Sequence, residues 1–323
     1  MEPISKIDPQ TSQLYFRGIN AVELAKTTDY ESVLFLLVSG NLPTNSQRKK
    51  LIRRMNQFRE LYSKNILSLE LLIDRLSGIR EEHSLNLHDV LLAYVSLCPM
   101  VVAHQFAQSQ NIETETPDEK LSHAANFLGM VRGITQMDNE VRDLETALIL
   151  PMDDPDNPSL TSLTQALEKG DESDALRAAL KAHVGPLHHG AGTLAMAMFE
   201  DIQKPDNAKQ YLAERLSSGG KIYGLGHRIY RGIDPRAVVL REMLERRTMK
   251  TYDEWILHVS DAVAREGKIL LSKDKGIEAF PNIDLYNAAV YFTFGFPTEL
   301  NTSLFAVSRA AGWMAHILEL KSE

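Results

Sequence analysis

The stretch LHDVLLAYVSLCPMVVA, residues 87–103, decides the fold class. Residues 87–97 are apolar nearly all round, so a helix formed here has no extensive polar face and must be buried. Pro99 interrupts the apolar run at residues 90–103, which is also shorter than the ~20 residues that a membrane-spanning helix needs. We therefore expect a core helix of a globular protein and no membrane partner.

Helical signals dominate on both sides of this stretch. Residues 28–31 and 44–47 have the spacing of a capping box. In this motif the side chain of the capping residue accepts the backbone N–H three residues later, and the side chain of that later residue accepts the backbone N–H of the capping residue. Other segments of helical composition cover residues 69–76, 118–131, 140–150, 173–183, 191–200, 235–246, 251–266 and 298–320. Few convincing strands and no helix–strand alternation occur, so we expect an all-α fold of a dozen or more helices.

Length and composition fit a globular protein of about two domains. The chain has 323 residues, of which 44% are hydrophobic and 24% charged, enough to bury a sizeable core. Breaks rich in glycine and proline at residues 185–192 and 217–235 suggest the division into two domains. Residues 1–10 lack the apolar segment of a secretory signal, so we expect a cytoplasmic protein.

Charge and cysteine content exclude several kinds of protein. The 35 Lys and Arg residues against 43 Asp and Glu give a net charge of −8, which argues against a nucleic-acid binder that relies on overall basicity. Cys98 is the single cysteine, so no internal disulfide and no cysteine-based metal cluster can form. Its apolar neighbours indicate a small core residue.

Four segments combine ionisable side chains with glycine, proline or an apolar helix. They are GPLHHGAG at 185–192, GLGHRIYRGIDPRA at 224–237, FPNIDLYN at 280–287 and LFAVSRAAGWMAHILE at 304–319. Histidine and carboxylate groups transfer protons near neutral pH, and arginine matches carboxylates and phosphates. Together the segments indicate acid–base chemistry on an anionic substrate.

Each residue in these segments also has a simpler structural explanation. His188 can be a hydrogen-bonded loop residue, and with His189 it lacks the spacing of a metal site, so we expect no metal. Asp234 and Asp284 can each be the capping residue of the helix that follows. Arg309 can belong to an interface ion pair.

Taken in order, the segments resemble the citrate synthase family, which includes the 2-methylcitrate synthases. The stretch YFRGINAVELAKTTDYESVLFLLVSGNLPT, residues 15–44, is similar to the family's opening, and the resemblance extends from about residue 4 to residue 320. It implies a two-domain all-α fold with a cleft between the domains. The large domain, residues 1–187 and 291–323, would form a homodimer. The small domain, residues 188–290, would carry the coenzyme A and catalytic loops.

The resemblance also implies a Claisen-type condensation. In this reaction acetyl-CoA or another short acyl-CoA joins oxaloacetate or a related 2-oxo acid, and the thioester is hydrolysed. His188 matches the family residue that hydrogen-bonds the thioester carbonyl, His227 the one that polarises the keto group, and Asp284 the base. Arg236 and Arg309 match the arginines that hold the carboxylates of the oxo acid.

Coenzyme A binding is implied in the same way. Arg231 matches an arginine near the phosphates of coenzyme A. The backbone of residues 222–227, with Ile222, Gly224 and Gly226, matches the loop around the adenine. The resemblance therefore predicts a coenzyme A thioester as cosubstrate, no permanently bound cofactor and no nucleic-acid partner.

Three features depart from the family pattern. Asp154 is a predicted substrate-binding residue where family members carry a histidine that contacts oxaloacetate, provided that residues 151–160 align without a gap. The chain ends at Glu323, before the family's tail and its arginine, and His189 and Gly192 replace the more usual Gly and Asn. An acid beside a dicarboxylate repels it. Two alternatives therefore remain: a catalytically impaired CoA-thioester-binding paralogue, or an enzyme that cleaves a citryl-CoA-like thioester.

Overall fold

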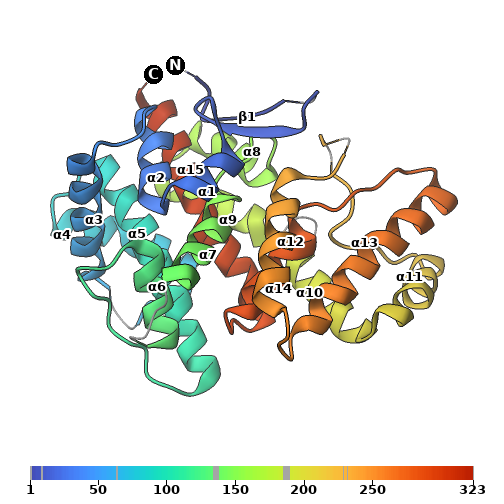
Figure 1. Cartoon of the computed structure of the whole chain (residues 1–323). Coiled ribbons are helices and arrows are strands. Elements are labelled where there is room, and N and C mark those ends of the chain that lie inside the picture. Colours follow the sequence, from blue (N-terminus) through green and yellow to red (C-terminus); the bar gives the residue numbers. More distant parts are fainter. Residues whose placement is uncertain are drawn as a thin grey trace. The chain divides into compact units, whose positions relative to one another are not determined.

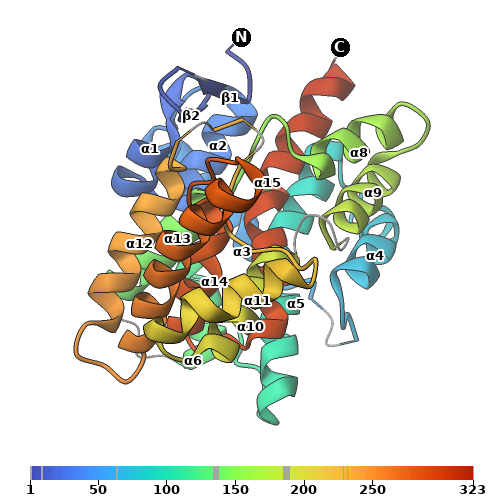
Figure 2. The same ribbon diagram turned by 90° about the vertical axis from the view of Figure 1, so that its right-hand side faces the viewer.

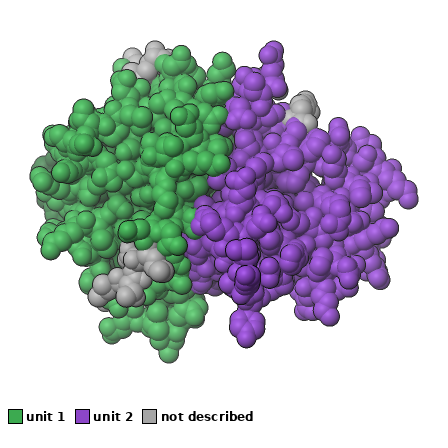
Figure 3. All heavy atoms as spheres, in the orientation of Figure 1, with its two compact units in different colours: residues 1–6, 15–185, 303–323 green, residues 7–14, 186–302 purple. Residues whose placement is uncertain are grey.

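The computed structural model confirms the all-α fold (Figures 1 and 2). It describes residues 2–8, 10–62, 65–133, 138–184, 190–227, 229–230 and 232–322. In this part of the chain fifteen α-helices account for most of the residues, and strands occur only near the N-terminus. Contacts within the chain divide it into two compact units: unit 1 is residues 1–6, 15–185 and 303–323, and unit 2 is residues 7–14 and 186–302 (Figure 3).

A small three-stranded sheet opens the chain and was not predicted. Strands β1 (Ser5–Asp8), β2 (Gln13–Phe16) and β3 (Ile19–Asn20) lie in the order β1-β2-β3. Strands β2 and β3 are antiparallel, with Phe16 opposite Ile19. Each strand has at most four residues, which is too short for an alternating pattern to stand out in the sequence.

Unit 1 contains α1 to α9 and all but the first two residues of α15. Its helices are α1 (Ala21–Thr27), α2 (Tyr30–Ser39), α3 (Asn45–Arg59), α4 (Leu69–Glu82), α5 (Leu87–Gln110), α6 (His123–Arg132), α7 (Asp138–Ile149), α8 (Pro158–Leu167), α9 (Glu172–Val184) and α15 (Asn301–Ser322). Both ribbon views show α15 among the other helices of this unit, and Trp313 at its middle is fully buried.

Pro99, which interrupts the apolar run of the sequence, lies inside helix α5. Pro99 does not interrupt it, and the helix continues for 24 residues. A proline inside a helix removes one backbone hydrogen bond, and here the surrounding core holds the helix together, because Pro99 and its neighbours are buried. The helix is long and apolar enough to cross a membrane, but 89% of its most apolar window is buried inside the protein. It is therefore a core helix, and Cys98 within it is fully buried, as predicted.

Unit 2 contains α10 (Gly190–Ile202), α11 (Ala208–Ser217), α12 (Pro235–Thr248), α13 (Glu254–Lys275) and α14 (Ile283–Thr293). Short 3-10 helices precede α11 and α15, at Pro205–Asn207 and Thr298–Leu300. Helices α12, α13 and α14 pack on one another, and α10 packs on α14. Between α11 and α12, residues 218–227, 229–230 and 232–234 form no helix.

The boundaries of the two units can be set beside the predicted domains. After residue 15, the chain passes from unit 1 to unit 2 at residues 185/186 and back at 302/303, where residues 187/188 and 290/291 were expected. Residues 7–14 of the N-terminal sheet group with unit 2. The boundary at residues 302/303 falls inside α15, two residues after that helix begins.

Candidate functional site

Two segments of unit 2 that are far apart in sequence are joined by backbone hydrogen bonds. Leu225 and Pro281 form an isolated antiparallel bridge, and the N–H of Asn282 donates to the carbonyl of Gly224 at 3.0 Å. The N–H of Gly226 donates to the carbonyl of Phe280 at 2.7 Å. The predicted adenine-binding loop is thus fixed to the segment that leads into α14, the helix that carries Asp284.

Glycine is required at one point of this contact. Gly224 has φ +79°, which side chains rarely adopt, and a Cβ there would lie 2.6 Å from the Cα of Leu285. Gly226 also has a positive φ. Ile222, in the same loop, is buried and lies close to Gly267 of α13. The loop therefore rests directly on α13 and on the first turn of α14.

Asn282 joins the loop to Asp284. Its Oδ1 accepts the backbone N–H of Asp284 at 3.0 Å, and its Nδ2 donates to the carbonyl of Gly226 at 2.7 Å. Asn282 is therefore the capping residue of α14, and the alternative in which Asp284 caps that helix is wrong. The half-buried Asp284 lies in the first turn of the helix, where its carboxylate is not used as the cap.

The ring of His227 is oriented by its own loop. Its Nδ1 accepts the backbone N–H groups of Ile229 at 3.2 Å and Tyr230 at 3.3 Å. The ring of Tyr230 packs against the imidazole, with centroids 4.3 Å apart and planes inclined by 39°. Because Nδ1 accepts, the neutral imidazole carries its hydrogen on Nε2, which makes that atom a donor.

Asp234 and Arg236 form a buried ion pair at the start of α12. Both are almost completely buried, with 0% and 1% of their surface exposed. The guanidinium donates from Nε to Oδ1 at 3.0 Å and from Nη2 to Oδ2 at 2.9 Å. Asp234 also accepts the N–H of Arg236, so the prediction that it caps the helix is confirmed. Its Oδ2 further accepts the N–H of Ile283 in α14 at 3.2 Å.

In unit 1 the loop between α7 and α8 is held by Asp153. Its Oδ2 accepts the hydroxyl of Ser5 at 2.5 Å and lies 2.9 Å from Nε2 of His316 on α15. Burial raises the pKa of Asp153, but His316, together with the charge of Arg309 and the Ser5 hydroxyl, outweighs burial and holds the pKa at about 2. The carboxylate is therefore ionised at neutral pH.

Asp154 and Arg309 both belong to unit 1. Asp154 is 7% exposed, and its backbone carbonyl accepts the N–H of Asn157, the capping residue of α8. Arg309 is 2% exposed on α15, with its guanidinium carbon 5.4 Å from the centre of the Phe305 ring. A hydrogen bond from Trp313 to Ser159 ties α8 to α15 as well.

The predicted residues therefore fall into two groups. Unit 2 brings together Ile222, Gly224, Gly226, His227, Arg236 and Asp284 around the joined loops. Asp154 and Arg309 belong to unit 1. His188 and Arg231 lie outside the residues that the structure describes.

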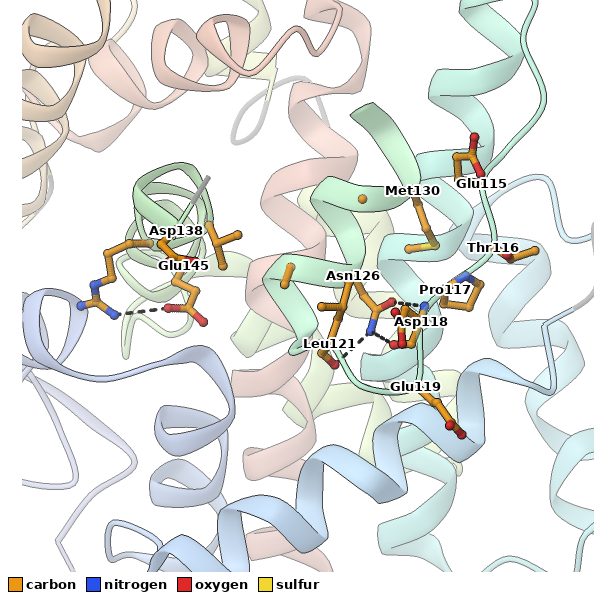
Figure 4. A pocket seen from close by; sticks show the side chains of 14 residues that line it. Glu115, Thr116, Pro117, Asp118, Glu119, Leu121, Asn126, Met130, Asp138 and Glu145 are labelled. Carbon is orange, nitrogen blue, oxygen red and sulfur yellow. Dashed lines mark hydrogen bonds and ion pairs between the residues drawn. The ribbon is translucent and has the colours of Figure 1, made fainter. Parts of the chain in front are cut away.

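A cavity of about 790 Å³ in unit 1 contains none of the predicted residues (Figure 4). It is lined by α6, α7 and residues 115–121, and its side chains include Asp118, Asp138 and Glu145. Burial and the negative charges of Glu31 and Asp29 raise the pKa of Glu145 to about 7, against the opposing effect of Arg142. An anionic substrate would meet mostly acids there, so we do not place the reaction in this cavity.

With this geometry in hand, comparison with known proteins identifies the family. The family model described as "Citrate synthase, C-terminal domain" matches residues 2–323. The chain belongs to the citrate synthase family.

Relatives in this family cover nearly the whole chain. A citrate synthase from Heyndrickxia coagulans is 31% identical, with 98% of this chain and 88% of the relative covered. A citrate/2-methylcitrate synthase from Bacillus subtilis is 30% identical over the same shares. The crystal structure of citrate synthase from Thermotoga maritima matches with a TM-score of 0.86 and 31% identity, covering 100% of this chain and 89% of that one.

Membership of the citrate synthase family defines the general activity. The protein is an enzyme of the citrate synthase type, an acyltransferase that converts acyl groups into alkyl groups on transfer. Both the citrate and the 2-methylcitrate synthases are among its relatives. The condensing activity is therefore common to both kinds of synthase.

Sequence reasoning missed several residues that hold the site. Asn282 carried a signal, since an Asn two residues before an acidic first turn is a favoured cap. The ion pair of Asp234 with Arg236 was also within reach of the sequence, because only two residues separate the charges. Ser5, Asp153 and His316 gave no signal, because 148 and 163 residues separate the partners.

Proposed function

We propose that this enzyme condenses acetyl-CoA or another short acyl-CoA with oxaloacetate or a related 2-oxo acid and then hydrolyses the thioester. The observation that carries the proposal is the Asn282 side chain, which bonds both to the loop before His227 and to the N–H of Asp284. A proton donor and a proton acceptor are thereby held on one framework. Such a pair is what a Claisen condensation requires.

Each predicted catalytic residue has a definite part in this reaction. The Asp284 carboxylate removes a proton from the α-carbon of the acyl thioester, while His188 donates a hydrogen bond to the thioester carbonyl as it becomes an enolate oxygen. The enolate carbon attacks the keto carbon of the oxo acid. His227 donates a hydrogen bond from Nε2 to the keto oxygen as that oxygen gains charge, and the alkoxide so formed takes a proton from water. Water then cleaves the thioester, releasing the coenzyme A thiol and a new carboxylate.

The oxo acid would be held by arginines. Arg236 and Arg309 are both buried, and a guanidinium in a dry environment binds a carboxylate strongly. Arg236 already shares its charge with Asp234, and Asp154 adds a further acid. We therefore propose that the preferred acceptor carries less negative charge than oxaloacetate.

The remaining parts of the proposal concern coenzyme A and assembly. Arg231 would contact the phosphates of coenzyme A, and the backbone at Ile222, Gly224 and Gly226 would surround the adenine. No permanently bound cofactor is needed. We propose a cytoplasmic homodimer whose large domain forms the subunit contact.

The test is a matrix of acyl-CoA substrates and 2-oxo acids, followed by the release of free thiol. The proposal expects thiol release from at least one pair, and Asp284→Asn should lower the rate by a factor of about 100 or more while leaving the affinity for coenzyme A nearly unchanged. Glu278→Gln is a matched control, because Glu278 lies exposed just before the same helix. Folded protein that releases no thiol with any pair would contradict the proposal.

A second candidate is a paralogue that binds CoA thioesters without turnover. The two adjacent buried acids, Asp153 and Asp154, favour it, since negative charges close to a bound dicarboxylate would repel it. Exchange of the methyl protons of acetyl-CoA in heavy water separates the two candidates. An enzyme with a working Asp284 exchanges or consumes the substrate, whereas a binding protein does neither. Citryl-CoA cleavage uses the same residues and is tested with that thioester.

A further inference from the structure

Helix α3 carries an unusual density of positive charge. Residues 48–54 read RKKLIRR, which places five cations in seven positions of a protein whose net charge is −8. The reaction proposed above uses none of them. Runs of this kind mark surfaces that bind anions.

A groove of about 690 Å³ lies along this helix in unit 1. Helices α3 and α5 pack against each other (Figure 1). The residues that line the groove belong to α2, α3 and the first turns of α5. Phe35, Leu51 and Leu92 form its apolar part, and the cations Lys50, Arg53 and Arg54 line it as well. A cavity of this volume suits a small organic molecule rather than a macromolecular surface.

One of the three cations is fixed in place. Arg54 donates from Nη2 to Asp89 at 2.6 Å and from Nη1 to Gln57 at 3.0 Å, and its guanidinium carbon lies 4.4 Å from the centre of the Phe58 ring. The hydrogen bond from Arg54 is the largest influence on the pKa of Asp89 and lowers it, so that acid is ionised and balances the charge of Arg54.

The other two cations supply the net charge of the groove. Lys50 and Arg53 are exposed, and no described acidic residue is ion-paired with either one. The groove therefore combines two uncompensated positive charges with an aromatic and aliphatic surface. An inorganic anion would use only the charges, and an apolar molecule only the surface.

We propose that this groove binds an organic polyphosphate with an aromatic part, such as a nucleoside di- or triphosphate. Lys50 and Arg53 would bind the phosphates, since ammonium and guanidinium groups form charge-assisted hydrogen bonds with phosphate oxygens. The base would lie against Phe35 and Leu51. All of these residues belong to unit 1, and the site requires none of the residues assigned to catalysis.

The experiment is calorimetric titration of the full chain with ATP, without acyl-CoA or oxo acid. The double variant Lys50→Glu/Arg53→Glu should weaken ATP binding by at least about tenfold, because two charge-assisted contacts become repulsive. The matched control is Lys49→Glu, which removes a neighbouring exposed cation on the same helix that does not line the groove. Its affinity should stay within about twofold of the unchanged protein.

Further titrations test the phosphate part and the aromatic part of the ligand separately, and distinguish this groove from the proposed coenzyme A site. Tripolyphosphate and adenosine should each bind more weakly than ATP if both parts of the groove are used. Coenzyme A is itself an adenine nucleotide with a pyrophosphate, so ATP binding at this groove is recognised by its loss in the double variant, whether or not coenzyme A competes with it. The proposal is overturned by no ATP binding, by equal losses in the double variant and in Lys49→Glu, or by binding that coenzyme A displaces and the double variant retains.

Discussion

The loop of unit 2 that precedes α12 and the loop of unit 1 that precedes α8 are each held by a buried aspartate, but the partners differ. Asp234 pairs with Arg236, two residues along the chain, whereas Asp153 pairs with His316 and Ser5, which are 163 and 148 residues away. The first anchor is local and the second depends on the complete fold of its unit. The difference shows that two loops of one chain can be stabilised in unrelated ways.

The two loops also differ in the charge of the residue that each is proposed to present to a substrate. In unit 2 the proposed substrate residue, Arg236, is itself the partner of the buried acid. In unit 1 the proposed substrate residue, Asp154, is the neighbour of the anchoring acid and has the same charge. If the proposed roles hold, the substrate residue of the unit 2 loop carries a positive charge and that of the unit 1 loop a negative one.

The largest effect is expected from Asp234→Asn. Asparagine keeps the size of the side chain and its ability to cap α12, but it leaves the guanidinium of Arg236 buried without its counter-charge. Breaking a buried pair in this way costs about 3–5 kcal/mol of unfolding free energy. Urea denaturation of the variant and of the unchanged protein measures this difference in unfolding free energy.

The control for this prediction is Asp253→Asn. Asp253 occupies the same position before α13, but its side chain makes no capping hydrogen bond there. Its unfolding free energy should change by less than about 0.5 kcal/mol. Equal effects of the two substitutions would show that the ion pair does not hold the unit 2 loop.

Asp153→Asn should have a smaller and pH-dependent effect. The pKa of Asp153 is about 2 in the folded protein against an ordinary value of 3.8, so ionisation contributes ~2 kcal/mol of stability above about pH 4. This contribution is lost as the pH falls from about 4 to about 2. We expect the variant to be less stable by ~2 kcal/mol at pH 7 and to have a flatter decline of stability in acid.

Denaturation between pH 2 and pH 7 checks this prediction. Asp156→Asn is the control, because Asp156 lies exposed in the same loop. It should leave the acid decline unchanged. An unchanged decline in Asp153→Asn itself would mean that His316 and Ser5 do not stabilise the charge.

The smallest effect is expected from Asp154→His, which introduces the residue that the resemblance to the family implies at this position. A histidine removes the repulsion and can donate to a carboxylate, so the preference for oxaloacetate over a monocarboxylic 2-oxo acid should rise about tenfold, or ~1.4 kcal/mol. The ratio of kcat/KM for the two acceptors measures the change. An unchanged ratio would indicate that Asp154 does not contact the oxo acid.

Much of the fold was predictable because capping residues and helical spacing mark most helices in the local sequence. The capping box at Thr44 and the start of α12 at Pro235 are confirmed. The helix expected from residue 118 begins instead at His123, because Ser122 is the cap and the side chain of Asn126 holds the backbone of Asp118 in a turn. At residues 28–31 the cap is Asp29 rather than Thr28. Such choices between neighbouring polar residues depend on contacts that the sequence does not show.

The candidate site was predictable to a different degree in the two units. The residues of the unit 2 loops were found from their motifs, and the local pair of Asp234 with Arg236 could have been found from its spacing. The contact of Asn282 with Gly226 could not, since 56 residues separate them. In unit 1, Ser5 and His316 meet Asp153 only because α15 and the N-terminal strand pack beside the loop.

The short turn after His227 has a consequence for the division of work in the reaction. Two peptide N–H groups already fill the lone pair of Nδ1, so the neutral ring offers only a hydrogen at its far side. A ring in that state can donate a hydrogen bond but has no free lone pair with which to accept a proton. In the proposed reaction, abstraction at carbon would therefore fall to Asp284, and two peptide N–H groups favour the role of His227 as a donor.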